Sequence, residues 1–531
     1  MQPLRVAIAG VGTVGGGVAQ ILHTHRALLA QRCAGRALKL VAVADQRPLD
    51  ALSAELQGHE VVHYSDAVEM AEQNKVGIDV IVETIGGYNV ARKVANSALQ
   101  RGVSLVTANK ALLAVHASEL ATAAEASGAK IGWEAAVGGG IPCIRALREG
   151  CAANRVSYAA GILNGTCNFI LTTMKETGRA FDDVLAEAQS LGYAETPPDL
   201  DVDGIDTAHK LSLVAAVSVG ALPAFDAVHV EGIRAIGSAD VALADELGFS
   251  IKLLGISSRI EPFESEDGFA GEPFRPCVDD ANEFGSLPVG HRAGGKLEEL
   301  QRVVGAPRPD PVVLQRVHPA LIPKDAALGA THGVLNGLFT IGACAVPSER
   351  ECPPTRPAAS FLHIYNHPVS CIIDGATVPR AHASSAGDFV GPVFTQGRGA
   401  GRDATASACV ADLMDLARSN GGAGAPTFGM PLGELSTMVT AGMDQRVGRY
   451  YLRVSGREAL ERMMSGLQAA NIKVQQTSKL VQKAQTTHRD LEHSCPSVAV
   501  ITGVAQEAAL RAAVLEPMGD KVAMIRVEGP W

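Results

Sequence analysis

This chain folds around the stretch Leu4-Arg-Val-Ala-Ile-Ala-Gly10-Val-Gly12-Thr-Val-Gly15-Gly-Gly-Val-Ala-Gln-Ile-Leu22. Its first part, Leu4 to Ala9, is an apolar run that ends at glycine, which predicts a short buried strand. The glycines that follow have the spacing Gly-x-Gly-x-x-Gly and open an apolar-periodic helix. Glycine at these positions permits a tight turn and a close approach of the backbone to a pyrophosphate at the helix N-terminus. The stretch therefore predicts a dinucleotide-binding unit.

The next hundred residues alternate strand-like and helical runs, as a doubly wound parallel sheet requires. A strand over residues 38–44 ends at Asp45, and Arg47 follows two residues later. An acid at this place binds the adenosine ribose of NAD, whereas an arginine pairs with the extra phosphate of NADP, so the cofactor preference stays open. The ends of two later strands carry Thr84 and Lys110. We expect both at the ligand crevice, where the carboxyl ends of the strands meet.

A glycine cluster follows the predicted sheet, in the run Glu134-Ala-Ala-Val137-Gly-Gly139-Gly-Ile141-Pro142. One interpretation is a structural turn. The other is a cation site, because bent loops expose carbonyl oxygens, and these together with a carboxylate suit alkali or alkaline-earth ions. The residues alone leave both interpretations open.

The most acidic stretch runs from Gly192 to Lys210 and carries five carboxylates: Glu195, Asp199, Asp201, Asp203 and Asp206. If residues 205–216 are helical, Asp206 and Lys210 lie at i and i+4 and share one face. A solvated loop with a surface ion pair is one interpretation. The other is a pocket that holds a cationic substrate group beside a proton-donating lysine.

Length and composition limit the function classes. A chain of 531 residues is expected to form two to four domains, and a net charge of -10 argues against nucleic acid as a partner. Ten cysteines without a Cys-x-x-Cys pair suit free thiols in a reducing compartment. Neither a signal-peptide leader nor a membrane-length apolar run is recognisable. We therefore expect a cytoplasmic protein with no membrane partner.

Six ordered motifs together resemble homoserine dehydrogenase. They are residues 10–15, Thr107-Ala-Asn-Lys110, residues 134–142, Gly161-Ile-Leu-Asn-Gly-Thr166-Cys-Asn-Phe-Ile, residues 192–210, and Gly397-Arg-Gly399-Ala-Gly401-Arg-Asp-Ala-Thr405. The likeness covers roughly residues 4–258, 315–340 and 386–418.

The resemblance implies an α/β fold in three parts. Residues 1–145 form a Rossmann NAD(P)-binding domain, and residues 146–430 an α+β substrate and dimerisation domain whose last part, 386–430, packs back on the first. Residues 448–531 form an ACT-like α+β domain. Long insertions at about 261–311 and 344–385 depart from the family, and the histidines of the second (His363, His367, His382) are expected to be solvated.

The implied reaction is the NAD(P)-dependent interconversion of L-homoserine and L-aspartate 4-semialdehyde in threonine, methionine and isoleucine biosynthesis. By motif, Lys210 is the expected proton donor or acceptor, and Lys110 is the alternative for this role. Asp206 is expected to be essential for activity. The substrate-binding carboxylates are Glu195, Asp201 and Asp206. The cofactor positions carried over are Thr13, Val14, Thr84, Ala108, Lys110, Gly192 and Gly401.

Further implications concern ions, assembly and regulation. A monovalent cation, usually sodium, is expected at Glu134, Val137, Gly139 and Ile141, largely on main-chain carbonyls, and the chain is expected to form a homodimer or homotetramer. Pro197 stands where the family more often has aspartate. The turn at residues 455–460 lacks the usual Asp-x-Pro-Gly, so threonine sensing is expected to be lost while the fold persists as an interface.

Two other functions compete with this one. An aldehyde dehydrogenase acting on the phosphorylated precursor would need an activated cysteine, and Cys143 and Cys167 lie near the predicted site. A non-catalytic NAD(P) or amino-acid sensor could use the same fold. It would need no proton donor, and the presence of both Lys110 and Lys210 argues against it.

Overall fold

The computed structural model describes residues 2–260, 310–342, 392–419, 426–478 and 497–529. The two predicted insertions fall almost wholly outside these described residues, as do His363, His367 and His382. Within the described part of the chain, no helix is long and apolar enough to cross a membrane.

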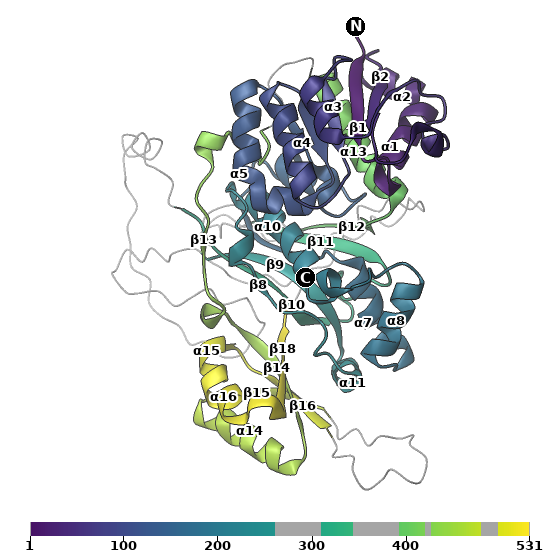
Figure 1. Cartoon of the computed structure of the whole chain (residues 1–531). Coiled ribbons are helices and arrows are strands. Elements are labelled where there is room, and N and C mark those ends of the chain that lie inside the picture. Colours follow the sequence, from purple (N-terminus) through teal and green to yellow (C-terminus); the bar gives the residue numbers. More distant parts are fainter. Residues whose placement is uncertain (1, 261–309, 343–391, 420–425, 479–496, 530–531) are drawn as a thin grey trace, which may run out of the picture.

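The N-terminal domain is built on a parallel sheet with the strand order β3-β2-β1-β4-β5-β6 (Figure 1). This order reverses direction between β1 and β4, which places the ligand crevice at the ends of those two strands. The predicted Rossmann domain is confirmed. The strands are β1 (Leu4–Ala9), β2 (Leu38–Ala44), β3 (Val62–Tyr64), β4 (Val80–Glu83), β5 (Ser104–Thr107) and β6 (Ile131–Gly132).

Helices cover both faces of this sheet: α1 (Thr13–Thr24), α2 (Arg26–Arg32), α3 (Ala67–Gln73), α4 (Asn89–Gln100) and α5 (Lys110–Ser127). One further helix, α13 (Arg402–Arg418), comes from far along the chain and lies against α1 (Figure 1). The approach is close because α1 carries glycine at the contact. A Cβ on Gly17 would lie 2.9 Å from the Cβ of Ala406.

The second domain contains a mostly antiparallel sheet in the order β12-β11-β7-β9-β10. Helices α7 (Gly165–Thr177), α10 (Ile205–Val219) and α11 (Ser238–Glu246) pack against it, next to α8 (Phe181–Ser190). Ala208 and Leu211 of α10 are buried in the same core as Ala159 of β7 and Val317 of β10. The strands are β7 (Val156–Ile162), β9 (Phe249–Ile260), β10 (Val312–Pro323), β11 (Leu335–Gly342) and β12 (Pro392–Arg398).

The C-terminal module continues this sheet, because β18 (Val522–Val527) pairs in parallel with β10. The module adds β14 (Val447–Ser455), α14 (Arg457–Ala469), β15 (Val474–Thr477), β16 (Ser497–Thr502) and α15 (Glu507–Leu510). Its strands run in the order β18-β14-β16-β15, all antiparallel. This is the β-α-β-β-α-β layout that an ACT-like domain needs, and the ACT-like identity stays a prediction.

Buried charges join the module to the second domain. The Arg526 guanidinium, 1% exposed, donates to Glu507 of α15 at 2.7 Å. It also donates at 2.7 Å to Glu231, which directly follows β8 (His229–Val230), a short strand paired with β10. Nearby, Glu528 accepts from Arg316 of β10 and from Arg446. Burial alone would raise the pKa of Glu528, but the two guanidinium groups lower it to about 2. These pairs keep the charges neutralised where the two parts meet.

Replacing Arg526 with methionine should therefore strip the buried Glu507 carboxylate of its strongest partner. We expect a loss of about 3 kcal/mol in the free energy of unfolding, measured by guanidinium titration. Arg511 also donates to Glu507, but its side chain is 40% exposed. Arg511→Met is the matched control and should cost no more than about 1 kcal/mol. Equal losses in the two variants would contradict the role given to Arg526.

Candidate active site

Two lysines and one aspartate meet between the two domains. Lys110 is the first residue of α5, at the carboxyl end of β5, and the Asn109 side chain caps this helix by accepting from the Leu112 N–H at 3.0 Å. Asp206 and Lys210 lie on α10, which follows Gly204 in the left-handed region at φ +84°. The end of a parallel strand and the start of a helix thus face each other across the domain boundary.

Asp206 is shared by the two lysines. Its Oδ2 lies 2.7 Å from Lys210 Nζ, and its Oδ1 lies 3.0 Å from Lys110 Nζ. The predicted pairing of Asp206 with Lys210 across one helical turn is confirmed. Burial would raise the pKa of Asp206, but Lys210 and then Lys110 hold it well below its usual value. Asp206 in turn raises the pKa of Lys110.

Lys210 is fixed by two hydrogen bonds. Besides Asp206, its ammonium donates to the main-chain oxygen of Leu163 at 2.7 Å, and its side chain is only 12% exposed. A lysine ammonium has three hydrogens. The third has no partner among the described residues, so it is available to an oxygen atom of a bound molecule.

The other carboxylates of the acidic stretch separate into two groups. Asp201 is half-buried near Asp206, and burial raises its pKa. Glu195 is exposed on the same loop, and both carboxylates contribute to the raised pKa of Lys110. Asp199 and Asp203 have solvent-exposed side chains and bind one guanidinium, that of Arg234, at 2.5 Å each. Arg234, which ties down the loop, belongs to no motif in the sequence.

The glycine-rich turn after β1 fits a dinucleotide. A Cβ on Gly15 would overlap the carbonyl oxygen of Gly10, which itself has φ +91°, whereas a Cβ on Gly12 would meet nothing within 4 Å. The space beside Gly12 lets a phosphate group approach the backbone at the start of α1. The Thr84 hydroxyl donates to the Gly10 oxygen at 2.7 Å, so this predicted cofactor residue holds the turn in place.

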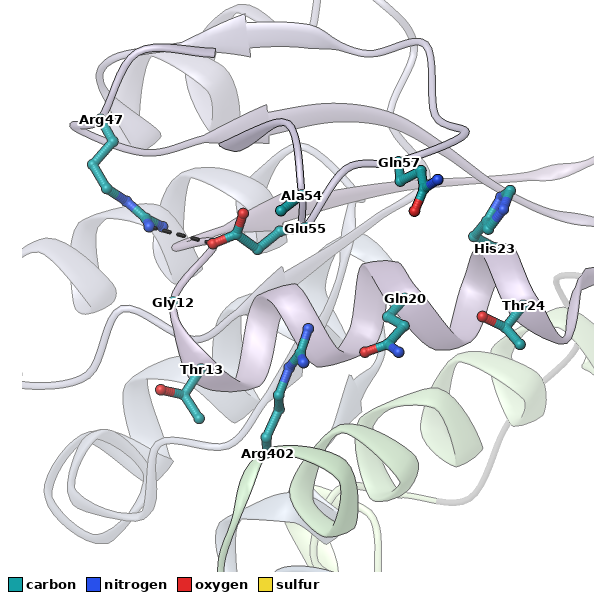
Figure 2. Close-up of a pocket in the computed structure, with 10 residues that line it drawn as sticks. All are labelled: Gly12, Thr13, Gln20, His23, Thr24, Arg47, Ala54, Glu55, Gln57 and Arg402. Atoms are coloured by element: carbon teal, nitrogen blue, oxygen red, sulfur yellow. Dashed lines mark hydrogen bonds and ion pairs between the residues drawn. The ribbon is translucent and has the colours of Figure 1, made fainter. Parts of the chain in front are cut away.

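A cavity of about 680 Å³ opens beside this turn, between the loop after β2 and the start of α13 (Figure 2). Arg402, the first residue of α13, extends beside α1 near Thr13, and Arg47 and Glu55 pair on the opposite wall (Figure 2). Arg402 has no hydrogen-bond partner among the described residues. Sequence reasoning missed it, although it directly follows Gly401 in a quoted motif.

Asp45 and Arg47, the two residues that left the cofactor preference open, bind each other. Arg47 Nε donates to Asp45 Oδ1 at 3.0 Å, and the Val11 N–H donates to Oδ2 at 2.8 Å. The hydrogen bond from Arg47 is the main reason that the pKa of Asp45 falls to about 2. The negative charge at the end of β2 is therefore already compensated inside the protein.

The remaining predicted cofactor positions are spread over the same cleft and beyond it. Val14 and Ala108 are partly buried against the core of the first domain. Gly401 precedes α13 at φ +109°. Gly192 lies in the exposed turn after α8, in the second domain.

The predicted cation site has its carboxylate already in use. Glu134 Oε1 accepts from the Ile144 N–H at 3.0 Å and Oε2 from the Arg145 N–H at 2.9 Å, so the side chain caps α6 (Cys143–Arg145). Only main-chain oxygens of the loop are left for an ion, and that of Val137 accepts from the Cys143 thiol. Among the described residues, no group of three or more His, Cys, Asp or Glu side chains is placed to hold a metal.

The thiols near the site are not activated. Cys143 and Cys167 are both buried, and burial raises the pKa of each well above its usual value. A nucleophilic cysteine needs the opposite shift. The structure therefore disfavours the aldehyde dehydrogenase alternative.

The chain combines a Rossmann sheet that has an open glycine turn with a lysine–aspartate pair whose ammonium keeps one hydrogen without a partner among the described residues. Together these features define the class of an oxidoreductase that uses a nicotinamide dinucleotide. Comparisons with known proteins identify the family. The model "Homoserine dehydrogenase, NAD binding domain" matches residues 10–134, and the model "Homoserine dehydrogenase" matches residues 142–347.

Relatives and solved structures agree. Homoserine dehydrogenase of Pseudomonas aeruginosa is 36% identical over 79% of this chain and 73% of its own length. That of Neisseria gonorrhoeae is 31% identical over 99% of both chains. The crystal structure of a homoserine dehydrogenase from Thiobacillus denitrificans superposes with a TM-score of 0.73 at 31% identity, covering 99% of this chain and 98% of that one.

The chain belongs to the homoserine dehydrogenase family. The predicted family, enzyme class and function are confirmed: the chain is an NAD(P)-dependent oxidoreductase with homoserine dehydrogenase activity.

The two glycines of the turn should respond differently to alanine. Gly15→Ala forces the turn open and should lower the free energy of unfolding by about 1–3 kcal/mol. In Gly12→Ala the free energy of unfolding should stay within about 0.5 kcal/mol of that of the parent chain, because the new methyl group meets no protein atom within 4 Å. It should instead weaken NADPH binding, followed by the fluorescence of the bound dinucleotide. Unchanged NADPH affinity in Gly12→Ala would contradict this account of the turn.

Proposed function

We propose that Lys210 gives a proton to, or takes one from, the terminal oxygen of the substrate as L-aspartate 4-semialdehyde and L-homoserine are interconverted. The observation that carries this proposal is the third ammonium hydrogen of Lys210. It has no partner among the described residues, while the other two hydrogens are directed at Leu163 and Asp206. The bound nicotinamide supplies or accepts the hydride. A proton at a fixed position beside the carbonyl oxygen stabilises the alkoxide that forms.

Lys110 has a supporting role in this proposal. Its side chain is 39% exposed, and the raised pKa means that it holds its proton more firmly than an ordinary lysine. It is a poorer acid and a good fixed positive charge for the substrate α-carboxylate. Asp206 has both oxygens engaged by the lysines, so it holds and neutralises them. Asp201 and Glu195 are left to pair with the substrate ammonium.

The distinction between the lysines can be measured. Lys210→Ala should lower kcat for semialdehyde reduction by about 10²- to 10⁴-fold while NADPH affinity stays nearly intact. Lys110→Ala should mainly raise KM for the semialdehyde, because it removes a binding charge. Asp206→Asn should lower kcat strongly. Near-normal turnover in Lys210→Ala, followed by NADPH absorbance, would refute the proton-donor role.

We also propose that the chain prefers NADP to NAD. The support is that Asp45, which would otherwise repel the extra phosphate, is compensated by Arg47. In addition, Arg402, which has no partner among the described residues, brings a positive charge to the same cavity. Anion recognition of this kind is typical of arginine.

This preference yields a ratio to measure. Wild-type kcat/KM should be higher with NADPH than with NADH. Arg47→Ala should reduce the NADPH-to-NADH ratio by roughly tenfold or more, as expected for the loss of one charge-assisted contact. NADH kinetics in the same variant are the internal control and should be unchanged or better, since Asp45 becomes free. A ratio that does not move would contradict the proposal.

The remaining parts of the proposal concern the cation, the assembly and the C-terminal module. A monovalent cation would bind main-chain oxygens of Glu134, Val137, Gly139 and Ile141, and the left-handed φ of Gly139 (+56°) supports the required bend. A homodimer or homotetramer in the cytoplasm is proposed with it. The five described cysteines form no disulfide with one another, which supports a reducing setting. The C-terminal module is proposed as an ACT-like interface without threonine control.

A further inference from the structure

We infer that Asn164 is a positioning residue that sets the spacing of Asp201 and Asp206 and thereby the place at which Lys210 acts. Asn164 lies at the corner between β7 and α7 and is 4% exposed. The inference rests on the proposed role of Lys210 and adds to it the residue that holds the surrounding charges in register.

The orientation of the Asn164 amide is fixed by the fold. Its Oδ1 accepts from the Cys167 N–H at 2.7 Å and so caps the N-terminus of α7. Because the oxygen is used by the cap, the Nδ2 group must face the opposite way. Its two hydrogens are directed at two carboxylates, Asp201 Oδ1 at 2.8 Å and Asp206 Oδ2 at 2.9 Å.

Residue 164 must donate hydrogen bonds to both carboxylates without adding a charge, and the neutral amide of asparagine does this. Asp206 is compensated by two lysines, whereas Asp201 has no ammonium or guanidinium partner among the described residues. An arginine or lysine at residue 164 would cancel the charge that the substrate ammonium has to meet. An aspartate would add a third carboxylate and increase the repulsion. The amide holds both carboxylates and leaves the second oxygen of Asp201 free.

The same corner also aims Lys210. Leu163 directly precedes Asn164, and its carbonyl oxygen accepts from Lys210 Nζ at 2.7 Å and from Asn336 Nδ2 at 3.2 Å. Two consecutive residues at the end of β7 therefore hold the proposed proton donor and both nearby carboxylates. A shift at Asn164 would displace all three groups together.

Two substitutions separate positioning from helix capping. Serine caps helices well, so Asn164→Ser should keep Tm close to that of the parent chain. Asn164→Asp also keeps the cap, but it buries a third carboxylate beside Asp201 and Asp206, so its Tm should fall. Neither carries the bridging N–H₂ group. We expect kcat/KM for homoserine to fall by about 10- to 100-fold in both, as for lost hydrogen bonds to charged groups, with NADP affinity nearly unchanged.

The pH profile adds a readout that a purely structural role would not move. Asp201 must be ionised to hold an ammonium, and a carboxylate at residue 164 would raise its pKa further. The acid limb of log kcat/KM against pH should therefore move to higher pH in Asn164→Asp. In Asn164→Ser it should move less, because no charge is added.

Asp66 caps α3, far from the site, by accepting from the Val68 N–H at 2.8 Å. Asp66→Ser is therefore the matched control for exchanging a helix cap. It should leave both kcat/KM and the pH profile unchanged. Normal kcat/KM in Asn164→Ser together with an unmoved acid limb in Asn164→Asp would overturn the positioning role. So would a loss of kcat/KM in Asn164→Ser that follows a fall in Tm. Lys210→Ala, assayed in parallel, tests the proton-donor role separately: an active Lys210→Ala overturns that role and not the spacing set by Asn164.

Discussion

The structure depends on one buried carboxylate shared by two ammonium groups from different domains. Asp206 is 8% exposed, and a charge at that depth is costly unless it is paired. Its partners are Lys110, which begins α5 of the Rossmann domain, and Lys210, one turn along its own helix. The compensation is complete only when the two domains face each other in this arrangement. The interaction that neutralises Asp206 therefore also brings the cofactor crevice next to the acidic loop that is proposed to bind the substrate.

Other contacts of the fold hold the parts that surround this group. Thr84 fixes the glycine turn, Arg234 ties down the acidic loop through Asp199 and Asp203, and Asn164 joins Asp201 to Asp206. The continuous sheet from β10 to β18 and the buried Arg526 join the C-terminal module directly to the second domain. The second domain, which carries the acidic loop, thus shares one continuous sheet with the C-terminal module.

Local patterns in the sequence predicted much of this arrangement. The glycine turn and the Asp206–Lys210 pair depend on residues a few positions apart, where strand and helix periodicity suffice. Contacts between distant residues were missed. Asn164 and Asp206 are 42 residues apart, and no local sequence pattern predicts that they form a hydrogen bond. An asparagine just before a helix does favour an N-cap, but this says nothing about the carboxylates that its amide group contacts. Arg402 and Arg234 were missed for the same reason. The hydrogen bonds from the Ile144 and Arg145 N–H groups to the Glu134 carboxylate were not predicted either, and the cation site at this loop stays a prediction.

The central claim is that Asp206 remains ionised although it is buried, because Lys110 and Lys210 share it. The direct measurement is a ¹³C NMR titration of the aspartate carboxyl carbons, with the Asp206 signal assigned by its loss in Asp206→Asn. Because the folded pKa is depressed, the signal should stay at its ionised position as pH falls through the ordinary range near 3.9. Titration of this carboxylate at or above that range would contradict the account.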